Sequence, residues 1–208
     1  MLEFGDMISA FKSETGAKSN AEKYKGQTSL VAGIVNTLAT MFINTVLVII
    51  GLLVFTVVLS TFSPVSAAML LPQVVGTIIL FFFGIIFWLI GDSLAFVFGK
   101  MLGGTGDYGH FMGAISYPEG AGRILTGVLG LIPLVGGLLG FVAALWALNM
   151  SAKTIESVHN IGPWQAVGSI IVAAVVIIGG MMIVGIVLAP ILALLGFGTA
   201  VGATVLGV

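Results

Sequence analysis

Three charged residues, Asp92, Glu119 and Arg123, stand in or beside long apolar segments of the chain. An isolated charge within a membrane-spanning helix costs about 2.5 to 3.5 kcal/mol, so each of the three is expected to have a partner. Glu119 and Arg123 are four residues apart and therefore share a helix face, in the favourable order of acid before base. Two roles stay open for an Asp92, Glu119 and Arg123 cluster: a packing contact whose charges satisfy one another, or part of an ion or proton pathway.

A second acidic motif, Gly104 to Asp107, spells Gly-Thr-Gly-Asp. Intramembrane aspartyl proteases carry a Gly-x-Gly-Asp pattern around one of two catalytic carboxylates, which must lie about 3 Å apart to share a proton. The preceding acid, Asp92, is fifteen residues away, or about 22 Å along a continuous helix. The chain also lacks cysteine and a Gly-x-Ser-x-Gly motif. We therefore expect no catalytic residues and no enzyme.

The chain has two histidines, His110 and His159, and both fall in polar connections between apolar segments. Together they would make a metal pair, but two lone histidines are more often surface residues. We expect no metal site and no cofactor. Without a basic patch, the sequence gives no support to nucleic-acid binding.

The composition predicts that membrane helices hold these residues. Of the 208 residues, 59% are apolar and only 7% are charged, whereas about a quarter of the residues of a soluble domain are charged. Eight of the fifteen charged residues lie within the first 25, and none occurs from Gly26 to Gly91. The prediction is an all-α, polytopic helical membrane protein.

A spanning helix needs about 20 apolar residues, and the chain holds five such segments. We expect a polar and amphipathic cytoplasmic segment at 1–27 and one transmembrane domain at 28–208, with spans at about 30–62, 73–102, 111–132, 134–150 and 164–188. Asn36, Thr37, Thr40 and Asn44 suggest that the start of the first span packs inside the protein or at the interface. The tail, 190–208, leaves a sixth span or a re-entrant segment open.

The first twelve residues have an amphipathic helical pattern, with Phe4, Met7 and Phe11 on the apolar side. A helix this short needs a surface to be stable. Lipid headgroups, which would bury Phe4 and Phe11, and a packing partner are both open.

The lysines predict the orientation, because positively charged loops stay cytoplasmic. Apart from the amino-terminal segment, they occur in the second-to-third connection at Lys100 and in the fourth-to-fifth at Lys153. The amino terminus is thus expected in the cytoplasm and, with five spans, the carboxyl terminus on the far side. Gly-x-x-x-Gly pairs such as Gly99 with Gly103 favour tight packing within the chain first and a homo-oligomer second.

Short motifs follow one another between Gly99 and Gln165. In order they are a glycine-rich connection with an aromatic (Gly106, Asp107, Tyr108), a Tyr-Pro pair (Tyr117, Pro118), an Ile-Pro-x-x-Gly turn (Pro133, Gly136), an Ala-Leu-Trp-Ala-Leu-Asn-Met stretch and a polar connection with a histidine. In this order the segment resembles the Yip family, the Ypt/Rab-interacting membrane proteins, in its prokaryotic form.

The resemblance implies a five-span, non-enzymatic protein of membrane organisation or trafficking, integral to the cell membrane in a prokaryote. Its partners would be the lipid bilayer and membrane or cytoplasmic proteins. We expect a membrane scaffold or adaptor. The alternative is a small transporter, channel or accessory subunit with Asp92 and Arg123 in an ion or proton path, which a continuous aqueous cavity reaching Asp92 would favour.

Overall fold

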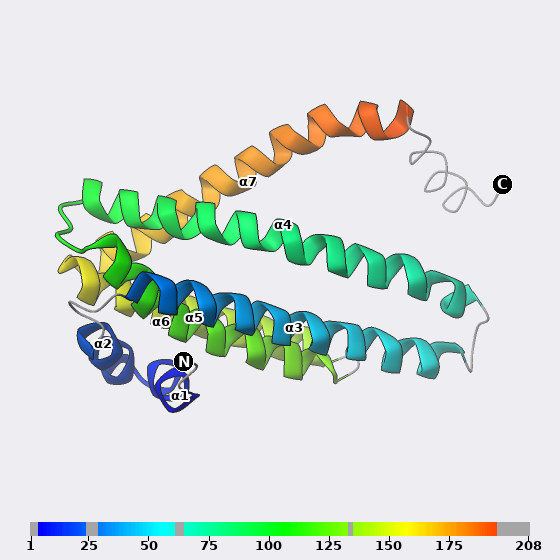
Figure 1. Ribbon diagram of the computed structural model, residues 1–208, viewed down its shortest axis with the longest axis horizontal. Coiled ribbons are helices and arrows are strands. Elements are labelled where there is room, and N and C mark those ends of the chain that lie inside the picture. The colour runs from blue at the N-terminus through cyan, green and yellow to red at the C-terminus, as the bar shows by residue number, and fades with distance from the viewer. Residues whose placement is uncertain (1–3, 24–28, 61–64, 133–134, 195–208) are drawn as a thin grey trace.

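The computed structural model describes residues 4–23, 29–60, 65–132 and 135–194 (Figure 1). Within these residues the chain is all-helical and has no strand, which confirms the predicted fold class. The helices are α1 (Phe4–Lys12), α2 (Glu14–Lys23), α3 (Ser29–Ser60), α4 (Val65–Met101), α5 (Tyr108–Gly130), α6 (Gly136–His159) and α7 (Pro163–Leu194).

Four helices contain a stretch that is long and apolar enough to cross a membrane. The stretches are Leu30–Val58, Gln73–Met101, Gly136–His159 and Pro163–Gly180. Helix α5 is not among them, and it is the more polar helix that carries both Glu119 and Arg123. It lies beside α3 and α6 (Figure 1), and twelve of its residues are buried. The most polar of the five long helices is thus the one surrounded by protein.

Three helices run further than their expected spans. Helix α6 continues past Met150 to His159, because the polar residues of this last part, such as Thr154, are buried under the neighbouring α2. Helices α4 and α7 continue through Pro72 and Pro190. A proline removes one backbone hydrogen bond, but ending a helix in lipid would leave many more groups unpaired. The sequence had placed helix boundaries at these prolines.

Three of the four polar residues near the start of the first span are buried, and the fourth, Asn44, is half-buried. Asn36, Thr37 and Thr40 are 3%, 0% and 0% exposed. Asn36 donates from Nδ2 to Oγ of Ser116 on α5 at 3.0 Å. These contacts fix α3 against α5.

The hairpin of α5 and α6 packs along α3 but turns back before the last residues of α3. A Cβ placed on Gly51 of α3 would lie 3.4 Å from Cδ2 of Leu131, just after α5. From Gly51, α3 continues nine residues to Ser60, or about 14 Å. Figure 1 shows the hairpin turning back well before the end of the bundle where α3 ends and α4 begins. We call the end of the bundle where α3 finishes and α4 begins the distal end.

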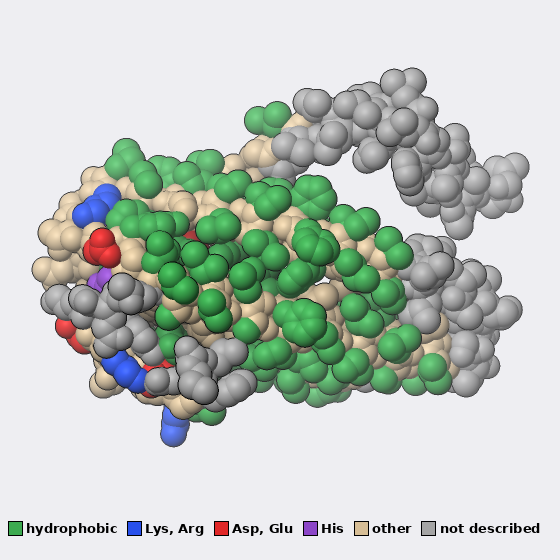
Figure 2. Space-filling view, viewed as in Figure 1, with side chains coloured by type: hydrophobic (Ala, Val, Ile, Leu, Met, Phe, Trp, Pro, Cys, Tyr) green, Lys and Arg blue, Asp and Glu red, His purple; other side chains and the backbone are tan. Residues whose placement is uncertain are grey.

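The opposite end carries the described lysines and is called the basic end. Its lysines are Lys12, Lys18, Lys23, Lys100 and Lys153, and it is also where α1 and α2 lie. On the face shown in Figure 2 the charged side chains gather there, while hydrophobic side chains cover the middle of the bundle. Large apolar residues such as Leu80 and Val175 are 70% and 63% exposed. This distribution is that of a protein with its middle in lipid.

Candidate functional site

Asp92, Glu119 and Arg123 line one cavity of about 450 Å³. Asp92 comes from α4 and the other two come from α5, while α6, α7 and Asn44 of α3 complete the wall. The antiparallel course of α4 and α5 brings residues together that lie about 30 positions apart in the sequence. The three charges that the sequence singled out are therefore neighbours around one space.

Arg123 forms an ion pair with an acid on its own helix, Glu119. Its Nη2 lies 2.6 Å from Oε2 of Glu119, and each side chain is 22% exposed. The same Oε2 accepts a hydrogen bond from Nε1 of Trp88 at 3.2 Å. Trp88 lies one turn before Asp92 on α4, so it fastens α4 to the ion pair of α5.

Several polar atoms in the cavity wall have no hydrogen-bond partner. They are Oδ2 of Asp92, Nη1 of Arg123 and Oδ1 of Asn44. Asp92 is only 7% exposed. A buried donor or acceptor without a partner costs about 1 to 3 kcal/mol. The cavity thus presents polar groups that a ligand or water would satisfy.

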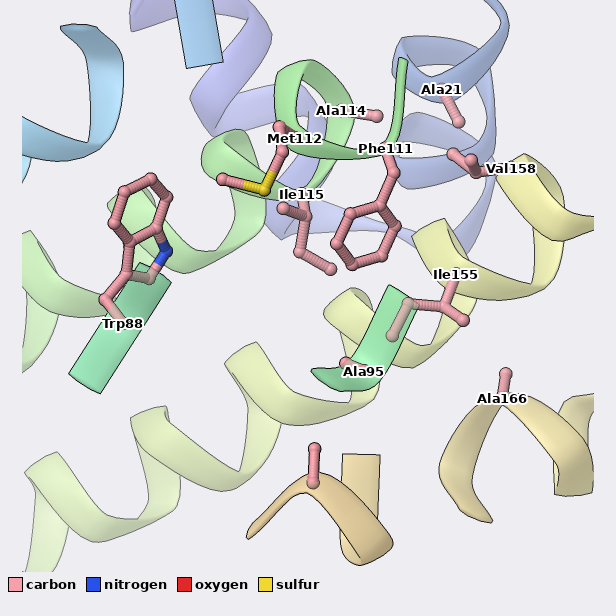
Figure 3. Close-up of a cluster of buried hydrophobic side chains, with 11 residues drawn as sticks. Ala21, Trp88, Ala95, Phe111, Met112, Ala114, Ile115, Ile155, Val158 and Ala166 are labelled. Atoms are coloured by element: carbon pink, nitrogen blue, oxygen red, sulfur yellow. The ribbon is translucent and has the colours of Figure 1, made fainter. Parts of the chain in front are cut away.

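The cavity is closed toward the basic end. Its wall there includes Ile115 and Ile155, which are 2% and 1% exposed. One turn further, Phe111 and Val158 belong to the same buried apolar cluster, shown in Figure 3. This cluster separates the charges from the lysine-bearing surface.

A second cavity of about 380 Å³ lies on the other side of the charges. It shares Asn44 and Thr126 with the first and extends between α3 and α5 to Ile132 and Gly137. The two spaces therefore follow one another from Asp92 toward the distal end.

Both histidines are buried, so the expectation that they lie at the surface is wrong. His159 is 0% exposed and packs between the rings of Phe96 and Phe111, at centroid distances of 5.0 and 5.7 Å. His110 is 8% exposed, and its Nε2 lies against the carbonyl oxygen of Ala21. Among the described residues no group of three metal-binding side chains occurs.

The glycine-rich connection is shaped to the ring of His159. A Cβ on Gly106 would lie 2.7 Å from the carbonyl oxygen of Val158 and 3.2 Å from Nδ1 of His159. Asp107 caps α5, since its Oδ1 accepts from the amide of His110 at 3.0 Å. The Gly-x-Gly-Asp motif thus has an evident structural role.

The other motif residues also hold helices together. The hydroxyl of Tyr108 lies 2.8 Å from Oγ of Ser93 on α4. Tyr117 and Pro118 are buried in α5, and a Cβ on Gly136 would lie 2.2 Å from the carbonyl oxygen of Leu129. Pro133 lies outside the described residues.

The amphipathic amino-terminal helix packs on the protein itself. Met7 and Ala10 of α1 are 2% and 0% exposed and contact Tyr117 of α5. Nε1 of Trp146 on α6 donates to the carbonyl oxygen of Phe11 at 2.6 Å. Of the two surfaces that the sequence left open, the structure shows packing, while Ile8 stays 64% exposed.

Salt bridges hold α2 to the end of α6. Nζ of Lys18 lies 2.9 Å from Glu156, and Nζ of Lys153 lies 3.5 Å from Glu14 and 3.3 Å from Glu156. The pairs of Lys18 with Glu156 and of Lys153 with Glu14 join residues more than 130 positions apart in the chain, whereas the contact of Lys153 with Glu156 lies within α6.

A family model described as the Yip1 domain matches residues 30–187. The chain belongs to the Yip1 family. The Yip1 domain contains every residue of the charged cavity and of the glycine-rich connection, whereas α1 and α2 precede it. No curated protein and no solved structure matches this Yip1 chain.

Sequence reasoning missed two participants in the Yip1-domain site, Trp88 and Ser151, and gave Asn44 a packing role only. Trp88 stands four residues before Asp92, and that spacing is the one signal that would have placed it on the same helix face. Ser151 is 5% exposed and lines the cavity from α6. It was placed in a connection because the sequence around it is polar.

Proposed function

We propose that this integral membrane protein of the Yip1 family is a non-enzymatic scaffold or adaptor, and that a protein partner docks on its basic end. The observation that carries the proposal is the way α1 and α2 are fastened to the bundle. Ion pairs from Lys18 and Lys153 and the hydrogen bond from Trp146 join them to α6. The result is a preorganised polar surface at one end of a protein whose other exposed side chains are largely apolar.

A preorganised surface loses less conformational entropy on binding than a flexible tail. Exposed residues of both signs lie on it, including Lys12 and Glu14. Such a surface suits a polar protein partner.

The proposal is tested by placing a photo-crosslinking amino acid in the full chain in its native membrane. Thr15 on the basic end is exposed, and Leu138 on the lipid-facing surface is the control at 68% exposure. A discrete protein adduct from Thr15, and none from Leu138, supports docking at the basic end. If adducts are absent from Thr15 and also from Lys12, the adaptor proposal is wrong.

A second candidate function is an ion or proton path, which the cavity at Asp92 favours. The path would have to open through the apolar cluster of Ile115, Ile155 and Phe111. Reconstituted protein in liposomes with an internal pH dye measures this directly. Proton flux that is lost in Asp92→Asn would support conduction, while wild-type liposomes as tight as empty ones would exclude it.

A further inference from the structure

We propose that the charged cavity binds the headgroup of a phospholipid with a primary amine. Its ammonium group would lie on Asp92, its phosphate on Arg123, and its acyl chains would leave between α6 and α7. This site is separate from the docking surface on the basic end and does not depend on it.

The two unpartnered charged atoms define the chemistry of the ligand. Oδ2 of Asp92 is a buried acceptor, and Nη1 of Arg123 is a buried donor. A ligand that satisfies both must carry a donor and an acceptor a few ångströms apart. An ammonium group supplies the donor, and a phosphate oxygen supplies the acceptor that a guanidinium prefers.

The charge balance selects an amine. The cavity holds two acids and one base, and Glu119 is already engaged by Arg123 and Trp88. Asp92 lies against Glu119 and Trp88 and forms no ion pair among the described residues. A primary ammonium would supply both a cation and N–H groups to this pair of acids. A quaternary ammonium has no N–H to donate, and a headgroup without an amine would leave Asp92 unpaired.

The cavity opens sideways toward lipid. Its rim includes Ala144, Leu148 and Ala174, which are exposed on α6 and α7. Deeper in the wall, Ala147 and Ala173 leave room where larger side chains would fill the space. The volume of about 450 Å³ is within the usual range for small-molecule sites. A headgroup fits inside while its chains stay in the bilayer.

The length of α3 places the charges near a membrane boundary. Its 32 residues span about 48 Å, and a hydrocarbon core is about 30 Å thick. Putting the distal end at one boundary leaves about 18 Å of helix beyond the other. Asp92 is nine residues before the end of α4 at Met101, or about 14 Å from the basic end.

Helix α1 lies at the same level. A Cβ on Gly120, next to Glu119, would be 3.2 Å from Cε of Met7. An amphipathic helix with an exposed Ile8 suits the headgroup region. With the distal end at one boundary, the charged cavity falls at the level of the lipid phosphates of the other leaflet.

Native mass spectrometry of the purified full chain tests the proposal. The probes are dioleoyl phosphatidylethanolamine, phosphatidylcholine and phosphatidylglycerol at equal concentration, and chain-free phosphoethanolamine. We expect the ethanolamine lipid to bind about tenfold more tightly than the other two lipids. Asp92→Asn should abolish this preference while keeping the weaker binding of phosphatidylcholine.

A matched pair of variants tests the entrance. Ala174→Trp should block lipid binding, whereas Val175→Trp, on the neighbouring exposed position, should leave it unchanged. Equal binding of the three lipids, or full binding by Ala174→Trp, would overturn the proposal. If chain-free phosphoethanolamine bound as tightly as the lipid, the ligand would be a soluble phosphoamine and the lipid proposal would be wrong. Asp92 is buried, so Asp92→Asn could impair folding. Ala174 is exposed, so Ala174→Trp should fold and still test lipid binding in that case.

Discussion

The ring of His159 occupies the space that a side chain on Gly104 would need. A Cβ on Gly104 would lie 2.5 Å from Nδ1 of His159 and 2.6 Å from the carbonyl oxygen of Gly99. The next residue, Thr105, donates from its amide to the carbonyl oxygen of His159 at 2.9 Å. The connection from α4 to α5 thus encloses the last residue of α6. It thereby fixes three of the helices that line the charged cavity.

We predict that Gly104→Ala destabilises the protein. The added methyl group must displace a buried ring or the backbone, and overpacking of this kind costs about 1 to 3 kcal/mol. The measurement is the midpoint of thermal unfolding in mild detergent. Gly168→Ala is the control, because a Cβ there meets nothing within 4 Å. Equal midpoints for the two variants would contradict the close packing at His159.

A second prediction concerns the ion pair of Glu119 and Arg123. Glu119→Gln and Arg123→Gln should each lower the unfolding midpoint, because each leaves a charge without its partner. An exposed ion pair contributes roughly 1 kcal/mol to the free energy of unfolding, and breaking a buried pair costs about 3 to 5 kcal/mol. Each side chain here is 22% exposed, so the loss of unfolding free energy should lie between these values. The double variant should recover most of the loss. Additive losses would show that the two residues are not coupled.

The sequence predicts the long helices well and the polar contacts poorly, for a physical reason. An apolar run such as α3 can be located from its length alone, because the bilayer requires it. The helical continuation of α6 to His159 depends on α2, which covers it through Lys18 and Glu156. A contact between residues 138 positions apart leaves no local pattern in either segment.

The same contrast applies within the site. Glu119 and Arg123 can be paired from their spacing on one helix, and Asp92 can be added from the antiparallel order of two helices. The cavity itself cannot be predicted this way. It exists because small residues such as Ala147 and Ala173 meet at one level of different helices, and that coincidence is set by helix register.

A third prediction tests how α2 is held. Glu156→Lys should release α2, because it removes the partner of Lys18 and places a third positive charge near Lys153. Trypsin cleavage at Lys18 and Lys23 should become faster. Adding Lys18→Glu restores one pair and should slow cleavage at Lys23 only in part, since the repulsion from Lys153 remains. The difference in cleavage rate between Glu156→Lys and the wild type should shrink at 1 M salt, where the Debye length is about 3 Å and these charges are screened. Cleavage of Glu156→Lys at the wild-type rate would exclude these ion pairs as the fastening.

The last prediction concerns orientation and the short hairpin. The chain has no cysteine, so single cysteines report position without background. Ser19→Cys and Ser157→Cys, both at the basic end, should react with a membrane-impermeant maleimide only after the cells are opened, because positively charged ends stay cytoplasmic. Ile132→Cys should react slowly from either side, although Ile132 is 44% exposed, because the hairpin ends about 14 Å before α3 does. Fast labelling of Ser19→Cys in intact cells would invert the orientation. Fast labelling of Ile132→Cys from outside would show that the hairpin reaches the far surface, and the headgroup depth inferred for Asp92 would then have to be revised.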